Sequence, residues 1–423
     1  MITPFPAQEQ KIQDIVNNLH PSNPIVDTSK TGTGKTYTAL WAAQRIGVKP
    51  FVVCPKSTIP VWHQASDDLE IELDDVVNYE KLRYGTHKRM KVWTMRREYE
   101  GKIYKNFYCK WVDKPELVIF DEAHVMSGMT SQLGNILIET FNSEIMMLCL
   151  TATMADSPLK LKAMGYILGL HRLNNYRQFL LEHQCYKTMT RGWKFRASPH
   201  ALKLMKHIHD DLKEKRKMVS ISTKDIPGAL NKGVIVPELR QIQGVKQVTQ
   251  LYNLGDFVKA RQASEEAKMV VFREDAEELL DEGNSVICFV NFHASVDALH
   301  NWFPEAGLVT GKQKPDEIQE TVRLFQTNEI RMLIAITAVG GVSINLHDTD
   351  GRFPRVSLLS PSFDALQLIQ ALGRTVRGGG KSVAIRKIIF AADTVEEMAY
   401  NSVRRKINTI DTLTDGDLTT FKD

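Results

Sequence analysis

The chain has 423 residues, of which 43% are hydrophobic and 25% charged, and its Gly and Pro contents are ordinary. This composition excludes disordered, collagen-like and low-complexity proteins, and the length predicts two to three domains of about 150 residues each. Lys and Arg number 54 against 50 Asp and Glu, so the net charge is +4, which is too weak to indicate a nucleic-acid partner.

Short apolar runs alternate along the chain with longer amphipathic segments, a pattern typical of parallel α/β layers. The strands expected in the first half are Pro24–Asp27, Phe51–Cys54, Leu117–Phe120 and Ile145–Leu150. Those expected in the second half are Val286–Val290, Leu308–Thr310, Met332–Ile336, Val356–Leu359 and Lys387–Phe390. The interval between Asn174 and Ala276 shows no clear strand series. We therefore predict an α/β fold of two domains, residues 1–225 and 226–423.

A glycine-rich motif follows the first expected strand and precedes a helical pattern. It reads Ser29-Lys30-Thr31-Gly32-Thr33-Gly34-Lys35-Thr36, with Ser29 in the place of the usual first glycine. Such a loop turns backbone N–H groups and a helix N-terminus toward phosphates. Lys35 is placed to reach the β- and γ-phosphates, and the Thr36 hydroxyl to hold Mg²⁺. The motif predicts ATP and Mg²⁺ as cofactors.

Two adjacent acids end the strand predicted at Leu117–Phe120, in the sequence Asp121-Glu122-Ala123-His124. A nucleotide site in a parallel sheet lies at such a strand end. Asp121 can complete the Mg²⁺ shell, and Glu122 can orient and deprotonate an attacking water. Together with the glycine-rich loop, this pair predicts an NTPase.

A third motif, Gln370-Ala371-Leu372-Gly373-Arg374-Thr375-Val376-Arg377, lies in the second half. If helical geometry continues through it, Arg374 and Arg377 share a face. Two guanidinium groups suit the charge that develops on a transferred phosphoryl group. The alternative is a solvated basic helix.

In their order and context, these motifs strongly resemble those of the superfamily 2 helicases and translocases. Gly32 to Thr36 resembles motif I, Asp121 to His124 the DEAH form of motif II, and Gln370 to Arg377 motif VI. Thr151-Ala152-Thr153 resembles motif III. The resemblance implies two tandem RecA-like domains with a nucleotide cleft between them, and catalytic roles for Lys35, Asp121, Glu122, Arg374 and Arg377.

Further segments are similar to the Swi/Snf-type branch. They are Val52–Ser57 followed by Trp62, Asn78–Leu82, Thr337–Leu346 and Val395–Glu397. Ser343 and the middle Ala152 depart from that branch, which usually has glycine at both places. The length barely exceeds a motor core, as in compact motors of phages and large viruses.

The resemblance also implies roles for residues outside the catalytic set. Gln8 would read adenine, and Gly32, Thr33, Gly34, Lys35, Thr36 and Gln370 would contact the nucleotide. His124, Thr151 and Thr153 would couple the ATP state to the grip on nucleic acid. The expected nucleic-acid contacts are Lys56, Ser57, Tyr79, Asn291, Thr310, Gly311 and Thr337.

Charge is segregated between neighbouring segments. Lys81 to Lys114 holds eleven Lys or Arg against three acids, a local charge of +8, and Asp67 to Asp75 just before it holds six acids and no base. Aromatic residues interleave with these bases, which suits a duplex track or a stacking platform for bases. A solvated face whose aromatics lie in the core is equally consistent.

We expect an ATP-dependent motor that moves on, or remodels, duplex or branched DNA. A strand-separating RNA helicase, or a catalytically weak nucleic-acid-binding scaffold, is the alternative. No wedge hairpin can be read from the sequence, which favours translocation. Five cysteines without a Cys-x-x-Cys pair and the lack of any apolar run of roughly 18 residues predict an intracellular, soluble protein without a membrane partner. We further expect a monomer or a loosely associated state.

Overall fold

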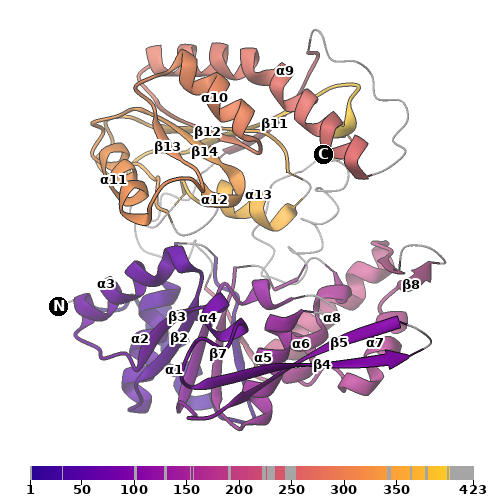
Figure 1. Ribbon diagram of the computed structural model, residues 1–423. Helices are drawn as coiled ribbons and strands as arrows, with labels where there is room; N and C mark the ends of the chain where they lie inside the picture. The colour runs from indigo at the N-terminus through magenta and orange to yellow at the C-terminus, as the bar shows by residue number, and fades with distance from the viewer. Residues whose placement is uncertain are drawn as a thin grey trace. The chain divides into compact units, whose positions relative to one another are not determined.

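The computed structural model describes residues 2–30, 32–99, 102–127, 131–152, 154–155, 157–188, 192–221, 225, 234–242, 254–340, 344–362, 364–376, 380–397 and 400. The described residues up to Asp225 form one compact unit, and those from Val234 to Tyr400 form another (Figure 1). Since residues 226–233 lie outside the described ranges, the exact domain boundary stays a prediction.

The first unit is built on a six-stranded, fully parallel sheet in the order β10-β1-β7-β6-β2-β3. Its strands are β1 (Ile25–Asp27), β2 (Pro50–Cys54), β3 (Asp75–Asn78), β6 (Leu117–Asp121), β7 (Met146–Leu150) and β10 (Met218–Val219). Its helices are α1 (Pro6–Asn18), α2 (Lys35–Ile46), α3 (Ile59–Leu69), α4 (Tyr79–Arg83), α5 (Gln132–Asn142), α6 (Lys162–Ile167), α7 (Tyr176–Glu182) and α8 (Pro199–Glu214).

Alternate residues of this sheet enter two separate cores. Val52, Ile119 and Leu148 pack against α1, α2 and α3 on one face. Val53 and Phe120 pack against α5 to α8 on the other. Because both faces are covered, the central strands are apolar throughout, which made them readable in the sequence.

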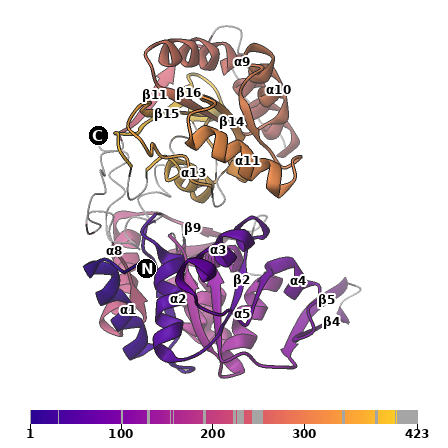
Figure 2. The same ribbon diagram turned by 90° about the vertical axis from the view of Figure 1, so that its left-hand side faces the viewer.

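Two antiparallel hairpins are added to the first unit. One joins β4 (Met90–Tyr99) to β5 (Lys102–Trp111), and the other joins β8 (Cys185–Thr188) to β9 (Gly192–Phe195). Figure 2 shows β4 and β5 extending beyond the helices of this unit. Sequence reasoning missed both hairpins.

The second unit carries another parallel sheet, in the order β11-β16-β15-β12-β14-β13. Its strands are β11 (Val234–Arg240), β12 (Ser285–Val290), β13 (Gly307–Val309), β14 (Met332–Ile336), β15 (Arg355–Leu359) and β16 (Ile385–Ala391). Its helices are α9 (Leu254–Asp281), α10 (His293–Trp302), α11 (Pro315–Gln326), α12 (Thr337–Gly340) and α13 (Ala365–Leu372). Side chains of α9 and α10 share a core with β12, β14 and β15.

The α/β fold class with two parallel-sheet domains is therefore confirmed. Every predicted strand is present within two residues of its expected ends. The interval from Asn174 to Ala276, expected to lack strands, contains β8 to β11. Two of these, β10 and β11, are edge strands, and β11 contains Pro237, which an edge strand tolerates because it needs fewer backbone donors. Among the described helices, none is both long and apolar enough to cross a bilayer.

Candidate nucleotide-binding site

The glycine-rich loop connects β1 to α2 at the carboxyl edge of the first sheet. Gly32 and Gly34 have φ angles of +81° and +80°, which side-chain-bearing residues rarely adopt. A Cβ on Gly34 would lie 2.6 Å from Nε2 of Gln8, so the Gln8 side chain would have to shift. That Nε2 donates to the Thr33 carbonyl over 3.0 Å, which places Gln8 against the loop. Its adenine-reading role stays a prediction.

Lys35 begins α2 and folds back over the loop. Its Nζ donates to the carbonyls of Ser29 and Lys30, over 2.8 and 3.1 Å. Burial lowers the pKa of Lys35 to about 8, although the carboxylates of Glu122 and Asp27 act in the opposite direction. An ammonium group held among carbonyls in a desolvated loop is well placed to exchange them for phosphate oxygens. Thr36 follows it in the first turn of the helix.

Ser29, the departure from the glycine pattern, has a structural role. Its Oγ accepts a hydrogen bond from the backbone N–H of Ile221, over 2.8 Å, and another from Lys11 Nζ, over 3.2 Å. The hydroxyl thus ties the loop to the chain that follows β10. A glycine there would leave the buried Ile221 donor without this acceptor.

Beneath the loop lies a buried ion pair between Lys11 of α1 and Asp27 of β1. Lys11 Nζ is 2.7 Å from Asp27 Oδ2, and the two side chains are 2% and 0% exposed. Asp27 Oδ1 also accepts from the Ser29 N–H over 2.9 Å. Sequence reasoning missed this pair, because a lysine in an amphipathic helix is indistinguishable from a solvated one.

The acidic pair stands at the end of β6, where register places Asp121 beside Leu150 of β7, and Leu150 beside Asp27 of β1. Burial, together with the charge of Glu122, raises the pKa of Asp121 to about 6. Its Oδ2 accepts from the indole Nε1 of Trp62, over 3.0 Å. Two carboxylates confined in a buried site are a donor set that a divalent cation fits.

Glu122 turns the chain away from the sheet with a left-handed φ of +52°. Its Oε2 lies 3.3 Å from Nδ1 of His124, and the same nitrogen lies 3.2 Å from Oγ1 of Thr151. These contacts connect the acidic pair with the segment after β7, as the coupling hypothesis requires. Thr153 lies outside the described residues.

The expected nucleic-acid contacts fall into two groups. Lys56, Ser57 and Gly311 are exposed. Tyr79 is instead buried, and its hydroxyl donates to the Asp121 carbonyl over 2.6 Å. The Tyr79 ring thus belongs to the core beneath the acidic pair, and its contact with nucleic acid stays a prediction.

The second-unit candidates are also mostly engaged internally. Thr337 is buried and donates to the Val290 carbonyl over 3.0 Å. Thr310 is buried, and its backbone N–H and hydroxyl both donate to Gln313 Oε1. Asn291 Nδ2 donates to a carboxylate oxygen of Glu265, over 2.6 Å. These hydroxyl and amide groups thus hold loops in shape, and their contact with nucleic acid stays a prediction.

The arginine motif follows a helix that ends sooner than predicted. Helix α13 ends at Leu372 and Gly373 follows it, so helical geometry does not continue to Arg374. Gln370 is buried in α13, and Arg374 Nη1 lies 3.5 Å from the Ile344 carbonyl. The face proposed for the two arginines is therefore not helical at Arg374. Arg377 lies outside the described residues.

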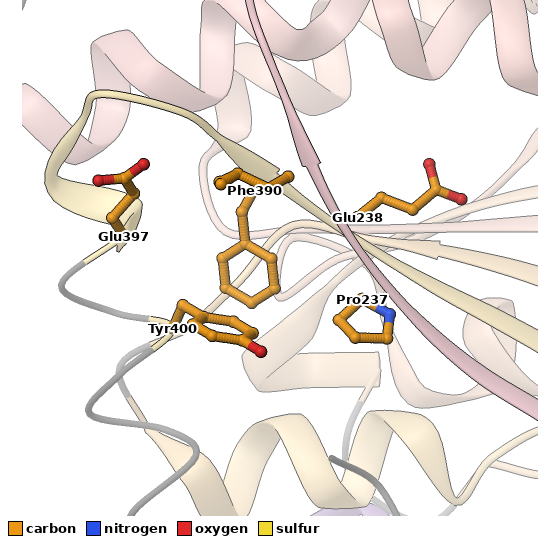
Figure 3. Close-up of a pocket in the computed structure, with 6 residues that line it drawn as sticks. Pro237, Glu238, Phe390, Glu397 and Tyr400 are labelled. Atoms are coloured by element: carbon orange, nitrogen blue, oxygen red, sulfur yellow. The ribbon is translucent and has the colours of Figure 1, made fainter. Parts of the chain in front are cut away.

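A separate pocket of about 320 Å³ lies in the second unit. Its lining residues are Pro237, Glu238, Leu239, Phe390, Glu397 and Tyr400. Figure 3 shows the Phe390 and Tyr400 rings next to each other; their centroids are 5.0 Å apart and their planes nearly perpendicular, at 86°. None of the predicted ATP-site residues lines it.

Two family models match the chain. The one for type III restriction enzyme, res subunit, matches residues 1–156, and the one for the helicase conserved C-terminal domain matches residues 272–379.

Individual proteins are similar as well. A putative ATP-dependent RNA helicase of Acanthamoeba polyphaga mimivirus is 29% identical over 457 residues, which cover 98% of this chain and 84% of that protein. Chromatin remodeling factor mit1 of Schizosaccharomyces pombe is 28% identical over 156 residues, 35% of this chain and 11% of that protein. The structure of S. cerevisiae Dbp5 bound to RNA and ADP BeF3 has a TM-score of 0.53 and 12% identity, covering 96% of this chain and 88% of its own. At that identity the likeness shows the fold alone, and the predicted pair of RecA-like domains is confirmed.

Proposed function

Because the chain is an ATPase of the superfamily 2 helicase type, we propose that it is a motor that couples ATP hydrolysis to movement on, or remodelling of, duplex or branched DNA. The main support for the ATPase site is that Lys35 lies near the Asp121–Glu122 pair. Both carboxylates lie close enough to act on the pKa of Lys35. The segments similar to the Swi/Snf branch, and the match to a chromatin remodeling factor, support DNA.

When bound, Mg²⁺–ATP supplies the transferable phosphoryl group and a divalent charge. Lys35 would exchange its two carbonyl acceptors for phosphate oxygens. Thr36 and Asp121 would hold the cation, with the Asp121 carboxylate oriented by the indole N–H of Trp62. Glu122 would orient the attacking water and take its proton. By resemblance, Arg374 and Arg377 would stabilise the charge that develops on the phosphoryl group.

The test is ATPase activity with blunt duplex DNA, forked DNA, single-stranded DNA and RNA as stimulants. Lys35→Ala and Glu122→Gln should abolish stimulated hydrolysis, since each removes a group that acts on phosphate or water. Lys203→Ala, which removes an exposed lysine of α8, is the matched control and should leave hydrolysis unchanged. Triplex displacement without strand separation would support translocation on duplex DNA.

A strand-separating RNA helicase is the second candidate, and the name of the mimivirus relative favours it. Stronger stimulation by RNA than by any DNA would overturn the DNA proposal in favour of this one. Absence of stimulation by every nucleic acid would overturn both, and would fit a catalytically weak scaffold.

A further inference from the structure

The hairpin of β4 and β5 packs one face against the core of the first unit and exposes its other face. On the inner face, Val92, Phe107 and Cys109 join the core that the sheet forms with α5 to α8. The root is also fixed by hydrogen bonds: Asn135 of α5 donates to the Phe107 carbonyl over 3.2 Å, and the Trp111 indole donates to Thr140 over 3.0 Å. The root of the hairpin is therefore anchored to the first unit, and its strands extend beyond the helices (Figure 2).

The outer face carries the alternate residues of the same strands. Register places Lys91 opposite Lys110 and Trp93 opposite Tyr108. The two rings of the aromatic pair are stacked, with centroids 5.8 Å apart and an interplanar angle of 12°, and Trp93 is 43% exposed. Neither lysine has an acidic partner among the described residues.

This outer face is only partly explained by the needs of the fold. The stacked aromatic pair stabilises the strand pair, but like charges directly opposite each other destabilise it. An indole that is 43% exposed also forgoes part of the free energy that its full burial would provide. The next pair outward, Met95 and Asn106, is exposed and uncharged, so no carboxylate balances the lysines there.

At the root of the hairpin, two basic side chains have acidic partners. Arg89 makes a bidentate ion pair with Asp74 and lies 3.0 Å from Asp113, and His87 lies 3.1 Å from Asp75. The acidic run thus neutralises the root of the hairpin and leaves the outer face cationic.

We propose that this outer face is a binding site for unpaired bases of a nucleic-acid strand, which at a DNA branch would lie beside the duplex. A base stacks on the Trp93–Tyr108 pair. Each lysine is two residues along its strand from one of these rings, at about 7 Å, and attracts the phosphates of the strand. Base–aromatic stacking tolerates any sequence because every base has a π-face. The inference rests on the proposed function in that the ligand is the nucleic acid on which the motor works.

The experiment measures binding of fluorescent forked DNA with a single-stranded arm, and of the same fork with abasic sites in that arm. Trp93→Ala/Tyr108→Ala should weaken binding of the normal fork about tenfold, as expected for loss of one stacked base. The abasic fork should bind the wild type about equally weakly, and the double variant should show no further loss on it. Trp93→Phe/Tyr108→Phe retains rings and should restore most of the affinity.

The lysines are tested through salt. Lys91→Ala/Lys110→Ala should lower the slope of log K against log salt by about 1.4, at about 0.7 per phosphate contact on a single strand. Lys187→Ala/Lys194→Ala, which replaces two exposed lysines on opposite faces of the other hairpin, removes the same charge and should leave the slope unchanged.

The outcomes separate the two proposals. If no nucleic acid stimulates wild-type hydrolysis, the proposed function fails. If stimulation is normal but Trp93→Ala/Tyr108→Ala binds both forks as the wild type does, the stacking site is overturned. Thermal melting checks that Trp93→Ala/Tyr108→Ala folds. If that variant does not fold, Trp93→Phe/Tyr108→Phe still tests whether the aromatic rings bind the bases.

Discussion

Changing Lys11 to Met tests whether the buried ion pair beneath the glycine-rich loop supports the first unit. The change removes the ammonium group that lies 2.7 Å from the Asp27 carboxylate and keeps a side chain of similar length. The carboxylate would remain buried, with the Ser29 N–H as a hydrogen-bond donor. Loss of one partner of a buried pair costs about 3–5 kcal/mol, because it leaves an uncompensated charge.

The matched control is Arg45→Met, which breaks the ion pair between Arg45 of α2 and Glu9 of α1. Those side chains are 35% and 48% exposed, so solvent screens the pair and its loss should cost below about 1 kcal/mol. In the double variant Lys11→Met/Asp27→Asn, the charge disappears while an acceptor for Ser29 remains. Most of the lost stability should return.

The assay is urea unfolding followed by tryptophan fluorescence, which reports mainly on the first unit because it contains five of the six tryptophans. Burial acts to raise the pKa of Asp27, but Lys11 and Lys35 hold it below its ordinary value of 3.8. In the wild type, this carboxylate therefore adds stability above its unfolded pKa, and the addition is lost as pH falls through the folded pKa. Without Lys11, burial should raise the folded pKa, so the destabilisation is full at pH 7 and shrinks toward pH 4. A loss below 1 kcal/mol at pH 7, or one independent of pH, would refute the reasoning.

Three other substitutions give separate outcomes. Trp62→Phe removes the N–H donor that orients Asp121. A hydrogen bond to a charged group contributes about 1.5–3 kcal/mol, so the change should raise the Mg²⁺ concentration for half-maximal hydrolysis about tenfold or more; an unchanged Mg²⁺ profile would contradict this. Ser29→Ala leaves the Ile221 N–H without its acceptor and should lower the free energy of unfolding by about 1–3 kcal/mol, as measured by urea titration. Lys268→Met removes the buried ammonium group that pairs with the buried carboxylate of Glu396 in the second unit. The free energy of unfolding should fall by about 3–5 kcal/mol in thermal unfolding, and Glu396→Gln in the same chain should restore part of it.

Sequence reasoning found the central strands because both of their faces are buried, so they are apolar without interruption. It failed on β3, β10 and β11, which lie at sheet edges, where fewer apolar residues are needed. The β4–β5 hairpin was missed for a different reason. Its outer face carries Trp93 and Tyr108 opposite the apolar inner face, and this hides the polar–apolar alternation that would have marked two strands.

The candidate site divides in the same way. Lys35, Asp121 and Glu122 were readable because their chemistry depends on local motifs at strand ends. The contact between Trp62 and Asp121 joins residues 59 positions apart, and only the fold brings them together. The burial of Tyr79 could not be predicted, because no local spacing distinguishes an exposed ring that contacts a ligand from a ring that packs in the core.

The charge of the basic segment shows why binding variants must be chosen from contacts rather than from counts. The segment has a net charge of +8 in the sequence, yet Arg89 is ion-paired with Asp74 and Asp113. Replacing Arg89 would therefore free two carboxylates at the hairpin root, and any loss of DNA binding would mix destabilisation with lost attraction. Lys91 and Lys110 face solvent without acidic partners among the described residues, so their removal changes the electrostatic attraction while the packing of the inner face is preserved.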